Sequence, residues 1–227
     1  CVNLTTETFV NSIKDEFSKF GIEKPVQDIF VDDDHVVWLL TEDGLYNVES
    51  KKTQKIRRDL NLQDLDVYDK DQLMLFYANG LLEIIDLKTE KKVYEGRAYD
   101  EKDVLRYDRS SVLLRNKNMF YQIRNGSKEA VLNQFDMTKK EWKEIMRTPY
   151  HLNNLAMKEQ TDSLLFIPCE YGYWVYETWK NGCRHFDTMI MENGQIVSTN
   201  LNVICFDRQG GMWVGTERRG LLYSQPH

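Results

Sequence analysis

One short pattern of polar and apolar positions recurs five times along the chain. Each copy has an acidic residue, a large apolar residue six positions later, and then a small or polar residue followed by two apolar or aromatic ones. The acidic residues are Asp32, Asp69, Asp108, Glu159 and Asp207, and the large apolar anchors are Trp38, Leu75, Leu114, Leu165 and Trp213. A period of roughly 40 to 50 residues predicts propeller blades or a solenoid array.

Within each copy the pattern predicts short strands. An apolar or alternating run such as residues 26–31 precedes the acid, a turn follows it, and a second strand carries the anchor. A glycine that requires positive φ opens a third strand, and a charged hairpin such as residues 87–94 leads to a fourth. Four antiparallel strands per unit, with no helices between them, predict an all-β fold: a β-propeller of about five recognisable blades, with the five anchors buried at equivalent places.

The first 24 residues stand apart from the blades, which we assign to residues 25–227. Phe9, Ile13, Phe17 and Phe20 have helical spacing and favour a short amphipathic helix. Closure of the propeller favours a strand instead, because residues 224–227 are too few for a fourth strand in the last copy. Both interpretations stay open, and we favour the helix.

Composition narrows the class of partner. The chain has 227 residues, of which 41% are hydrophobic, enough for a sizeable core. A net charge of −6 argues against nucleic acid and against an anionic membrane surface as partners. No run of about 18 apolar residues is present, so this segment itself is expected to make no membrane contact. The start at Cys1 fits either a lipoprotein N-terminus or an arbitrary chain boundary.

Four cysteines show no C-x-x-C spacing, which argues against a zinc or redox site. Cys205 lies in an apolar run and is expected to be a buried, inert thiol. Cys169 and Cys183 flank one strand pair and could form a local disulfide in an oxidising compartment.

The last copy, residues 203–223, closely resembles the two-component regulator propeller repeat. That repeat has an acid, a turn, a Trp followed by Gly-Thr, and a Gly before apolar and Tyr positions, which are here Asp207, Trp213, Gly215, Thr216, Gly220, Leu221, Leu222 and Tyr223. The first copy matches at Trp38, Thr41, Gly44, Leu45 and Tyr46. The three middle copies keep the spacing but lose the Trp and the Gly-Thr.

This repeat family is found above all in the periplasmic sensor regions of bacterial hybrid two-component systems, many of them carbohydrate-responsive. The resemblance implies a ligand-sensing or interaction module of such a receptor, periplasmic or at the cell surface, with any kinase activity outside this chain. It also implies a homodimer as one arrangement of the full receptor. The family usually has seven blades, so five indicate either a small propeller or a piece of a larger one.

Motifs for catalysis are missing: there is no G-x-S-x-G and no P-loop. We therefore expect no catalytic residues, no cofactor and no metal. His35, His151 and His227 are expected to face solvent, and the acidic turn residues are expected to cap backbone amides. The alternatives are an enzyme on a propeller scaffold, such as a lyase or glycan hydrolase using channel carboxylates and His151 or His185, and a scaffold that binds only protein.

Any ligand is expected at the loops between second and third strands, because in a propeller these loops and the blade-to-blade connections crowd one face. A small molecule, with an oligosaccharide as the candidate, would need polar groups from several blades. The candidate binding residues are Tyr77, Asn79, Arg115, Glu170, Tyr171, Glu217, Arg218 and Arg219. The aromatic run at 171–176 fits either a sugar platform or a blade core, and alignment with the third strands favours the core for Trp174.

Overall fold

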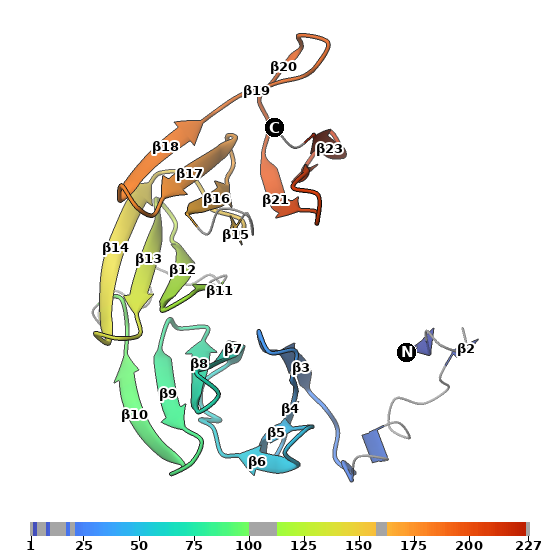
Figure 1. Ribbon diagram of the computed structural model, residues 1–227, viewed down its shortest axis with the longest axis vertical. Helices are drawn as coiled ribbons and strands as arrows, with labels where there is room; N and C mark the ends of the chain where they lie inside the picture. The colour runs from blue at the N-terminus through green and yellow to red at the C-terminus, as the bar shows by residue number, and fades with distance from the viewer. Residues whose placement is uncertain are drawn as a thin grey trace. The chain divides into compact units, whose positions relative to one another are not determined.

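The structure is a computed structural model that describes residues 2–3, 8–9, 17–18, 21–99, 113–157 and 163–225, with the backbone alone for residues 2–3, 8–9 and 113–115. Its regular structure is almost entirely antiparallel β (Figure 1). In the N-terminal segment β1 (Val2–Asn3) pairs with β2 (Thr8–Phe9), and Phe17 and Ser18 are helical. The choice between a helix and a closing strand there falls largely outside the described residues. The described part of the chain contains no helix long and apolar enough to cross a membrane.

Five sheets follow, and in each the strands pair in the order in which they occur along the chain. The first sheet consists of β3 (Asp28–Val31), β4 (Val37–Thr41), β5 (Gly44–Asn47) and β6 (Lys52–Gln54). The second consists of β7 (Leu62–Tyr68), β8 (Gln72–Tyr77), β9 (Leu82–Asp86) and β10 (Lys91–Gly96). The third consists of β11 (Leu113–Asn116), β12 (Met119–Asn125), β13 (Ala130–Asp136) and β14 (Glu141–Thr148).

The fourth sheet consists of β15 (Ala156–Met157), β16 (Leu164–Pro168), β17 (Tyr173–Glu177) and β18 (Gly182–Phe186). A small hairpin of β19 (Met189–Ile190) and β20 (Ile196–Val197) separates it from the fifth. The fifth has three strands, β21 (Leu201–Phe206), β22 (Met212–Thr216) and β23 (Leu221–Ser224). The predicted all-β fold of five complete or incomplete propeller-type meanders is confirmed.

The chain divides into two compact units, each described here by itself. The first contains residues 1–76 and 83–95, and so holds the first sheet and most of the second; the second contains residues 77–82 and 96–227. In the second unit consecutive sheets pack face to face. Its main core lies between the third and fourth sheets and includes Tyr121, Leu132, Leu165 and Tyr176. A smaller core between the fourth and fifth sheets is built around Leu201.

The repeat assignment holds for four copies and is shifted in the third. Trp38, Leu75, Leu165 and Trp213 all lie on the second strand of their sheets, whereas Leu114 lies on β11, the first described strand of the third sheet. That copy lacks both the Trp and the Gly of the repeat. The spacing alone therefore assigned the anchor of this copy to the second strand, whereas Leu114 lies on the first described strand of the sheet.

One of the large apolar anchors, Trp213 in the fifth sheet, is less buried than predicted. Trp38 is 3% exposed, and Leu75 and Leu165 are fully buried, but Trp213 is 36% exposed. The prediction that Trp213 is buried is wrong, because the face of the fifth sheet that carries it is not covered by another sheet in the described structure.

An identical hydrogen-bonded arrangement, which we call the Asp–Trp clasp, occurs in the first and fifth sheets. The Trp38 indole Nε1 donates to Asp32 Oδ2 (2.9 Å), while Asp32 Oδ1 accepts from the amides of Asp34 (3.1 Å) and Val36 (2.9 Å). Trp213 Nε1 donates to Asp207 Oδ2 at 3.1 Å, and Asp207 Oδ1 accepts from two turn amides in the same way. The predicted capping role is confirmed for these two acids, and it explains the six-residue spacing between acid and Trp.

Glycines before third strands have the predicted positive φ, from 71° to 147° at Gly44, Gly80, Gly172 and Gly220. At Gly172 a Cβ atom would stand 1.9 Å from the carbonyl oxygen of Phe186. Only glycine fits there, because both the backbone conformation and the close approach of β18 exclude a side chain.

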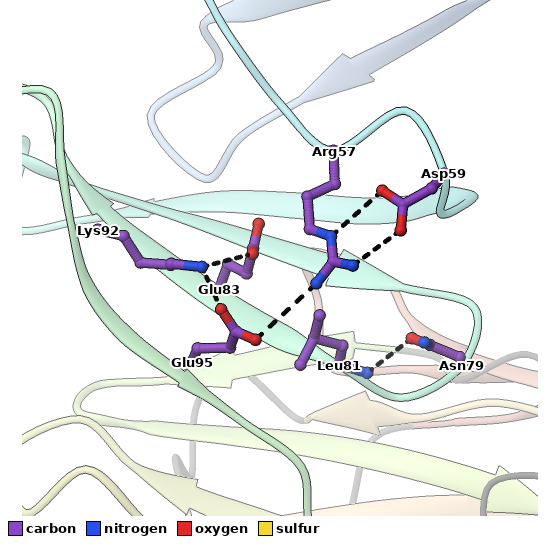
Figure 2. Close-up of polar contacts among 7 residues, drawn as sticks. All are labelled: Arg57, Asp59, Asn79, Leu81, Glu83, Lys92 and Glu95. Atoms are coloured by element: carbon purple, nitrogen blue, oxygen red, sulfur yellow. Dashed lines mark hydrogen bonds and ion pairs between the residues drawn. The ribbon is translucent and has the colours of Figure 1, made fainter. Parts of the chain in front are cut away.

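Ion pairs join the segment between β6 and β7 to strands β9 and β10 of the second sheet (Figure 2). Arg57 donates to both carboxylate oxygens of Asp59, with Nη2 2.7 Å from Oδ2, and its Nη1 lies 3.8 Å from Glu95 Oε1. Lys92 pairs with Glu95 and, at 3.2 Å, with Glu83, whose side chain is 4% exposed. The connection is thus held by a continuous chain of charges within the first unit.

Candidate functional site

The turn between β8 and β9 contains two candidate residues and is built from internal contacts. Tyr77 is fully buried at the end of β8, so its expected place at a loop surface is wrong. The side-chain oxygen of Asn79 accepts from the Leu81 amide (3.1 Å; Figure 2), and its carbonyl oxygen accepts from the Tyr99 hydroxyl (2.7 Å). The side chain of Arg115 lies outside the described residues.

The other candidates lie in two loops of the second unit and are exposed. Glu170 and Tyr171 join β16 to β17, and residues 217–219 join β22 to β23. Glu217 Oε2 lies 4.0 Å from Arg218 Nε, whose side chain is 85% exposed, and the Arg219 amide donates to Thr216 Oγ1 (2.8 Å). Among the described residues, no buried group pairs with the guanidinium of Arg218 or Arg219.

Backbone hydrogen bonds join these loops to the connections between sheets. Glu170 N donates to the His151 carbonyl (3.2 Å), and the His151 amide lies 3.4 Å from Glu170 Oε2. Gly172 N donates to Thr199 O (3.2 Å), and Glu217 N donates to Asn200 O (3.0 Å). Loops distant in sequence thus meet at one end of the fourth and fifth sheets, as the propeller topology predicts.

Hydrogen bonds between polar side chains also connect the loops of the fourth sheet with those of the fifth. His151 Nδ1 lies 3.0 Å from Asn153 Oδ1, and Asn153 Nδ2 donates to Asn200 Oδ1 (2.9 Å) and to the Leu201 carbonyl (2.7 Å). Asn200 Nδ2 in turn lies 3.4 Å from Glu217 Oε2. We call this row of side chains the loop network. It holds the loop carrying Glu170 and the loop carrying Glu217 in a fixed relation, which a binding site made of several loops requires.

A cavity of about 350 Å³ opens beside the loop network. It is lined by Gly126, Ser127, Lys128, Glu129, Pro149, His151 and Glu170. The Nε2 atom of His151 is buried and has no hydrogen-bond partner among the described residues. His151 is half-buried in this wall instead of facing solvent as expected, whereas His35 is exposed as predicted and His227 lies outside the described residues. Buried polar atoms of proteins are nearly always hydrogen-bonded, so this unpaired nitrogen marks His151 as a candidate binding residue.

An aromatic group supports the same loop. The ring of Tyr150 meets Tyr171 edge-on (centroids 5.3 Å apart) and stacks on His185 (5.4 Å), which also stacks on Trp174 (4.5 Å). His185 Nε2 lies 2.7 Å from the Tyr171 carbonyl oxygen. Trp174 packs against the core, as favoured from the alignment, while Tyr171 stays 53% exposed. The Tyr171 ring is therefore held in place with much of its surface open.

The thiols in this region are not poised for reaction. Cys169 Sγ lies 3.7 Å from His185 Nε2, but burial raises the pKa of Cys169 to about 11, and burial also raises the pKa of Cys183 to about 11. Both thiols are therefore protonated at neutral pH and are poor nucleophiles. Among the described residues, no group of three or more His, Cys, Asp or Glu side chains is placed to hold a metal ion.

Two cysteine predictions are corrected. Cys169 and Cys183 are free thiols. They lie on either side of β17, two strand spacings or about 10 Å apart across the sheet, and the register displaces them further along the strands, because Cys183 is level with Leu165. Their separation therefore exceeds the roughly 7 Å between Cα atoms that a disulfide tolerates. Cys205 is exposed instead of buried, because alternation along β21 turns Ile204 to the core and Cys205 away from it.

A larger cavity, about 730 Å³, lies in the first unit. It is at the strand ends that face away from the loops between second and third strands. Trp38, Val67 and Leu87 are among its lining residues, and Asp34, Glu49, Lys52, Lys70 and Glu90 supply charges. In the wall of this cavity the Asp32 carboxylate and the Trp38 indole nitrogen already have hydrogen-bond partners, because they form the Asp–Trp clasp. The loop network and its unpaired His151 nitrogen are therefore the stronger candidate site.

Comparison with known protein families supports the resemblance of the last copy to the two-component regulator propeller repeat. The model of the two-component regulator propeller family matches residues 195–218. None of the curated proteins matches the chain. A chain in a crystal structure of a mitotic checkpoint complex is similar at 12% identity with a TM-score of 0.59, over 89% of this chain and 61% of that one.

The extracellular domain of a one-component system from B. thetaiotaomicron matches at 15% identity with a TM-score of 0.49, over 88% of this chain and 32% of that one. This chain thus spans less than two thirds of either structure. The first likeness concerns the fold alone. The five meanders, the likeness to the first structure and the matched segment identify an all-β chain of propeller blades in which residues 195–218 match the two-component regulator propeller repeat.

Proposed function

We propose that the chain is a non-catalytic ligand-sensing module in the extracytoplasmic part of a bacterial signalling receptor. The matched repeat at residues 195–218 supports the receptor class. The observation that carries the ligand-binding role is the convergence of loops on the cavity where the buried His151 Nε2 lacks a partner.

The chemistry of this site suits a neutral polyhydroxylated ligand such as an oligosaccharide. An open tyrosine ring offers the flat apolar surface on which a sugar face stacks, and Tyr171 has such a ring. Hydroxyl groups need several directional partners, and the cavity wall supplies an imidazole nitrogen, a carboxylate, an ammonium group and a hydroxyl from His151, Glu170, Lys128 and Ser127. Lys128 offsets one of the two glutamates in the wall, and the other, Glu129, pairs with Arg147, so the cavity has no strong net charge to select an ion.

Calorimetry of the whole chain against a panel of neutral oligosaccharides tests this proposal. A sensor must release its ligand as concentration falls, so we expect micromolar or weaker binding, about −8 kcal/mol or less favourable. Tyr171→Ala is expected to weaken binding by about fivefold through loss of stacking worth ~1 kcal/mol. His151→Ala is expected to weaken it through loss of one hydrogen bond.

Trp179→Ala is the matched control. Trp179 is 58% exposed and lies in the β17–β18 turn, at the other end of the same sheet from Tyr171. Its removal should leave binding unchanged. Binding that is lost with Trp179 and retained in the Tyr171 and His151 variants would place the site elsewhere. Turnover of an oligosaccharide that disappears in His151→Ala would favour the propeller-scaffold enzyme.

A further inference from the structure

Four Asn-Gly pairs occur in the chain, at residues 79–80, 125–126, 181–182 and 193–194. In such a pair the backbone nitrogen of the glycine can attack the side-chain amide carbon of the asparagine, because glycine has no side chain to shield its nitrogen. All four pairs therefore share the same intrinsic chemistry. The attack needs the chain to move locally, so the fold decides which pair reacts.

The pair Asn193–Gly194 lies in the turn of the β19–β20 hairpin, in the connection between the fourth and fifth sheets (Figure 1). Residues 192–196 are all exposed, and a Cβ atom on Gly194 would meet nothing within 4 Å. The turn is closed by hydrogen bonds from the Gly194 amide to the Met191 carbonyl (2.8 Å) and from the Gln195 amide to Asn193 Oδ1 (3.0 Å). Surface hydrogen bonds in so short a hairpin are among the first to open.

The pair Asn79–Gly80 has the same local geometry but is covered. The Gly80 amide donates to the carbonyl three residues before it (2.8 Å), Asn79 Oδ1 accepts from the amide two residues after it (3.1 Å), and the φ of Gly80 is 80° against 81° at Gly194. Here, however, the Tyr99 hydroxyl donates to the Asn79 carbonyl (2.7 Å), and a Cβ atom on Gly80 would stand 2.1 Å from that hydroxyl. The two turns thus differ in what covers them and not in their own hydrogen bonds.

The other two asparagines are held by hydrogen bonds of their side chains. Asn125 is 4% exposed, and its side-chain amide donates to the Leu152 carbonyl (2.8 Å) and accepts from the Leu152 amide (3.0 Å). Asn181 is exposed, but its Oδ1 accepts from the hydroxyl of Tyr176 (2.9 Å), a residue that is 2% exposed. Of the four pairs, all within the described residues, only 193–194 lacks both a buried hydrogen-bond partner and a covering side chain.

We propose that Asn193 is a site of spontaneous deamidation in the folded protein, with water as the second reactant. The lone pair of Gly194 N forms a bond to Asn193 Cγ, the bond from Cγ to Nδ2 breaks, and Nδ2 leaves as ammonia with the proton of the Gly194 amide. Water then opens the resulting cyclic imide at either of its carbonyl carbons. Attack at Cγ gives aspartate, and attack at the backbone carbonyl carbon gives isoaspartate.

Both products add a negative charge beside Glu192, and isoaspartate also adds a methylene group to the backbone of the turn. The inner side of the hairpin is anchored, because Val197 is 3% exposed and Met189 packs against the core around Leu201. We therefore expect the change to stay within the outer part of the hairpin and the sheets on either side to keep their structure. Ion exchange separates the modified chain from the original by its added charge.

Incubation of the folded chain at mildly alkaline pH, followed by proteolysis and mass spectrometry of the peptides, compares all four pairs in one sample. Asn193 should be converted about tenfold faster than Asn79 or more, Asn181 should fall between them, and Asn125 should stay unmodified. In urea the four rates should converge, because glycine follows each asparagine and the fold protects none of them. Equal rates at Asn193 and Asn79 in the folded chain, or a folded-state rate at Asn193 as low as that of Asn125, would overturn the proposal.

Two variants separate the chemistry of the pair from its protection. Asn193→Gln lengthens the side chain, so the imide closes far more slowly and the charge change of the whole chain should nearly disappear. Tyr99→Ala uncovers Asn79, which should then be converted at a rate approaching that of Asn193. Asn125 is the folding control, since its conversion would reveal general unfolding of the variant. A Tyr99→Ala chain in which Asn79 stays as slow as in wild type would refute the view that cover decides the rate.

Discussion

Removing the carboxylate of one Asp–Trp clasp should cost far more in the first sheet than in the fifth, although the bonds are the same. In Asp32→Ala the Trp38 indole N–H, in a side chain that is 3% exposed, loses its acceptor, which costs about 1 to 3 kcal/mol. The loss of the hydrogen bonds to the Asp34 and Val36 amides adds about 1 kcal/mol. We expect a total loss of about 2 to 4 kcal/mol in the free energy of unfolding.

In Asp207→Ala the equivalent three donors are released beside Trp213, which is 36% exposed, so water can take the place of the carboxylate. The expected loss is therefore clearly smaller than in Asp32→Ala. Urea unfolding followed by far-ultraviolet circular dichroism compares the two variants, and Asp32→Asn, which keeps one side-chain acceptor for the indole, should fall between wild type and Asp32→Ala. Equal losses at Asp32 and Asp207 would refute the view that burial of the clasp decides its contribution.

Three further outcomes are expected. Burial raises the pKa of Asp64 to about 6 from its ordinary 3.8, so the folded state binds this proton more tightly and the stability from this group falls as pH rises from about 4 to 6. Asp64→Asn should remove this pH dependence and raise the free energy of unfolding at neutral pH by up to about 3 kcal/mol, as measured by urea titrations at several pH values. Gly172→Ala should lower the melting temperature by several degrees, since the new Cβ meets the Phe186 carbonyl, and an unchanged value would contradict the geometry. In dilute, monomeric protein at neutral pH, alkylation should modify exposed Cys205 well before Cys169, whose raised pKa keeps it protonated.

The period of the repeat was enough to predict the five sheets, because acid, anchor and glycine each perform a local task. The acid caps its own turn, as at Asp32, and the glycine supplies a positive φ, as at Gly172. Where these residues are missing, spacing alone failed, and Leu114 was placed on the wrong strand. Burial of Trp213 could not be predicted, because it depends on whether another sheet covers it and not on the repeat itself.

The candidate site was predicted only as a region. The topology indicated that loops from several blades converge, and Glu170 and Tyr171 do border the cavity or its aromatic support. His151 was not chosen as a binding residue, because a lone histidine after a proline belongs to no motif. It becomes a candidate through Glu170, nineteen positions away, and through the cavity that both residues line. Tyr77 looked like a loop residue but ends a buried strand.

Strand pairing that always joins neighbours in the sequence has a consequence for how the chain folds. Every ladder in the five sheets connects consecutive strands, and each clasp closes over six residues. Contacts of such short range are formed at little cost in loop entropy, which favours rapid folding even in an all-β protein. Each blade can acquire its hydrogen bonds once its own roughly 40 to 50 residues are free to pair, without waiting for the rest of the chain. Contacts between blades, such as Asp33 to Asp66, then form afterwards, one blade at a time.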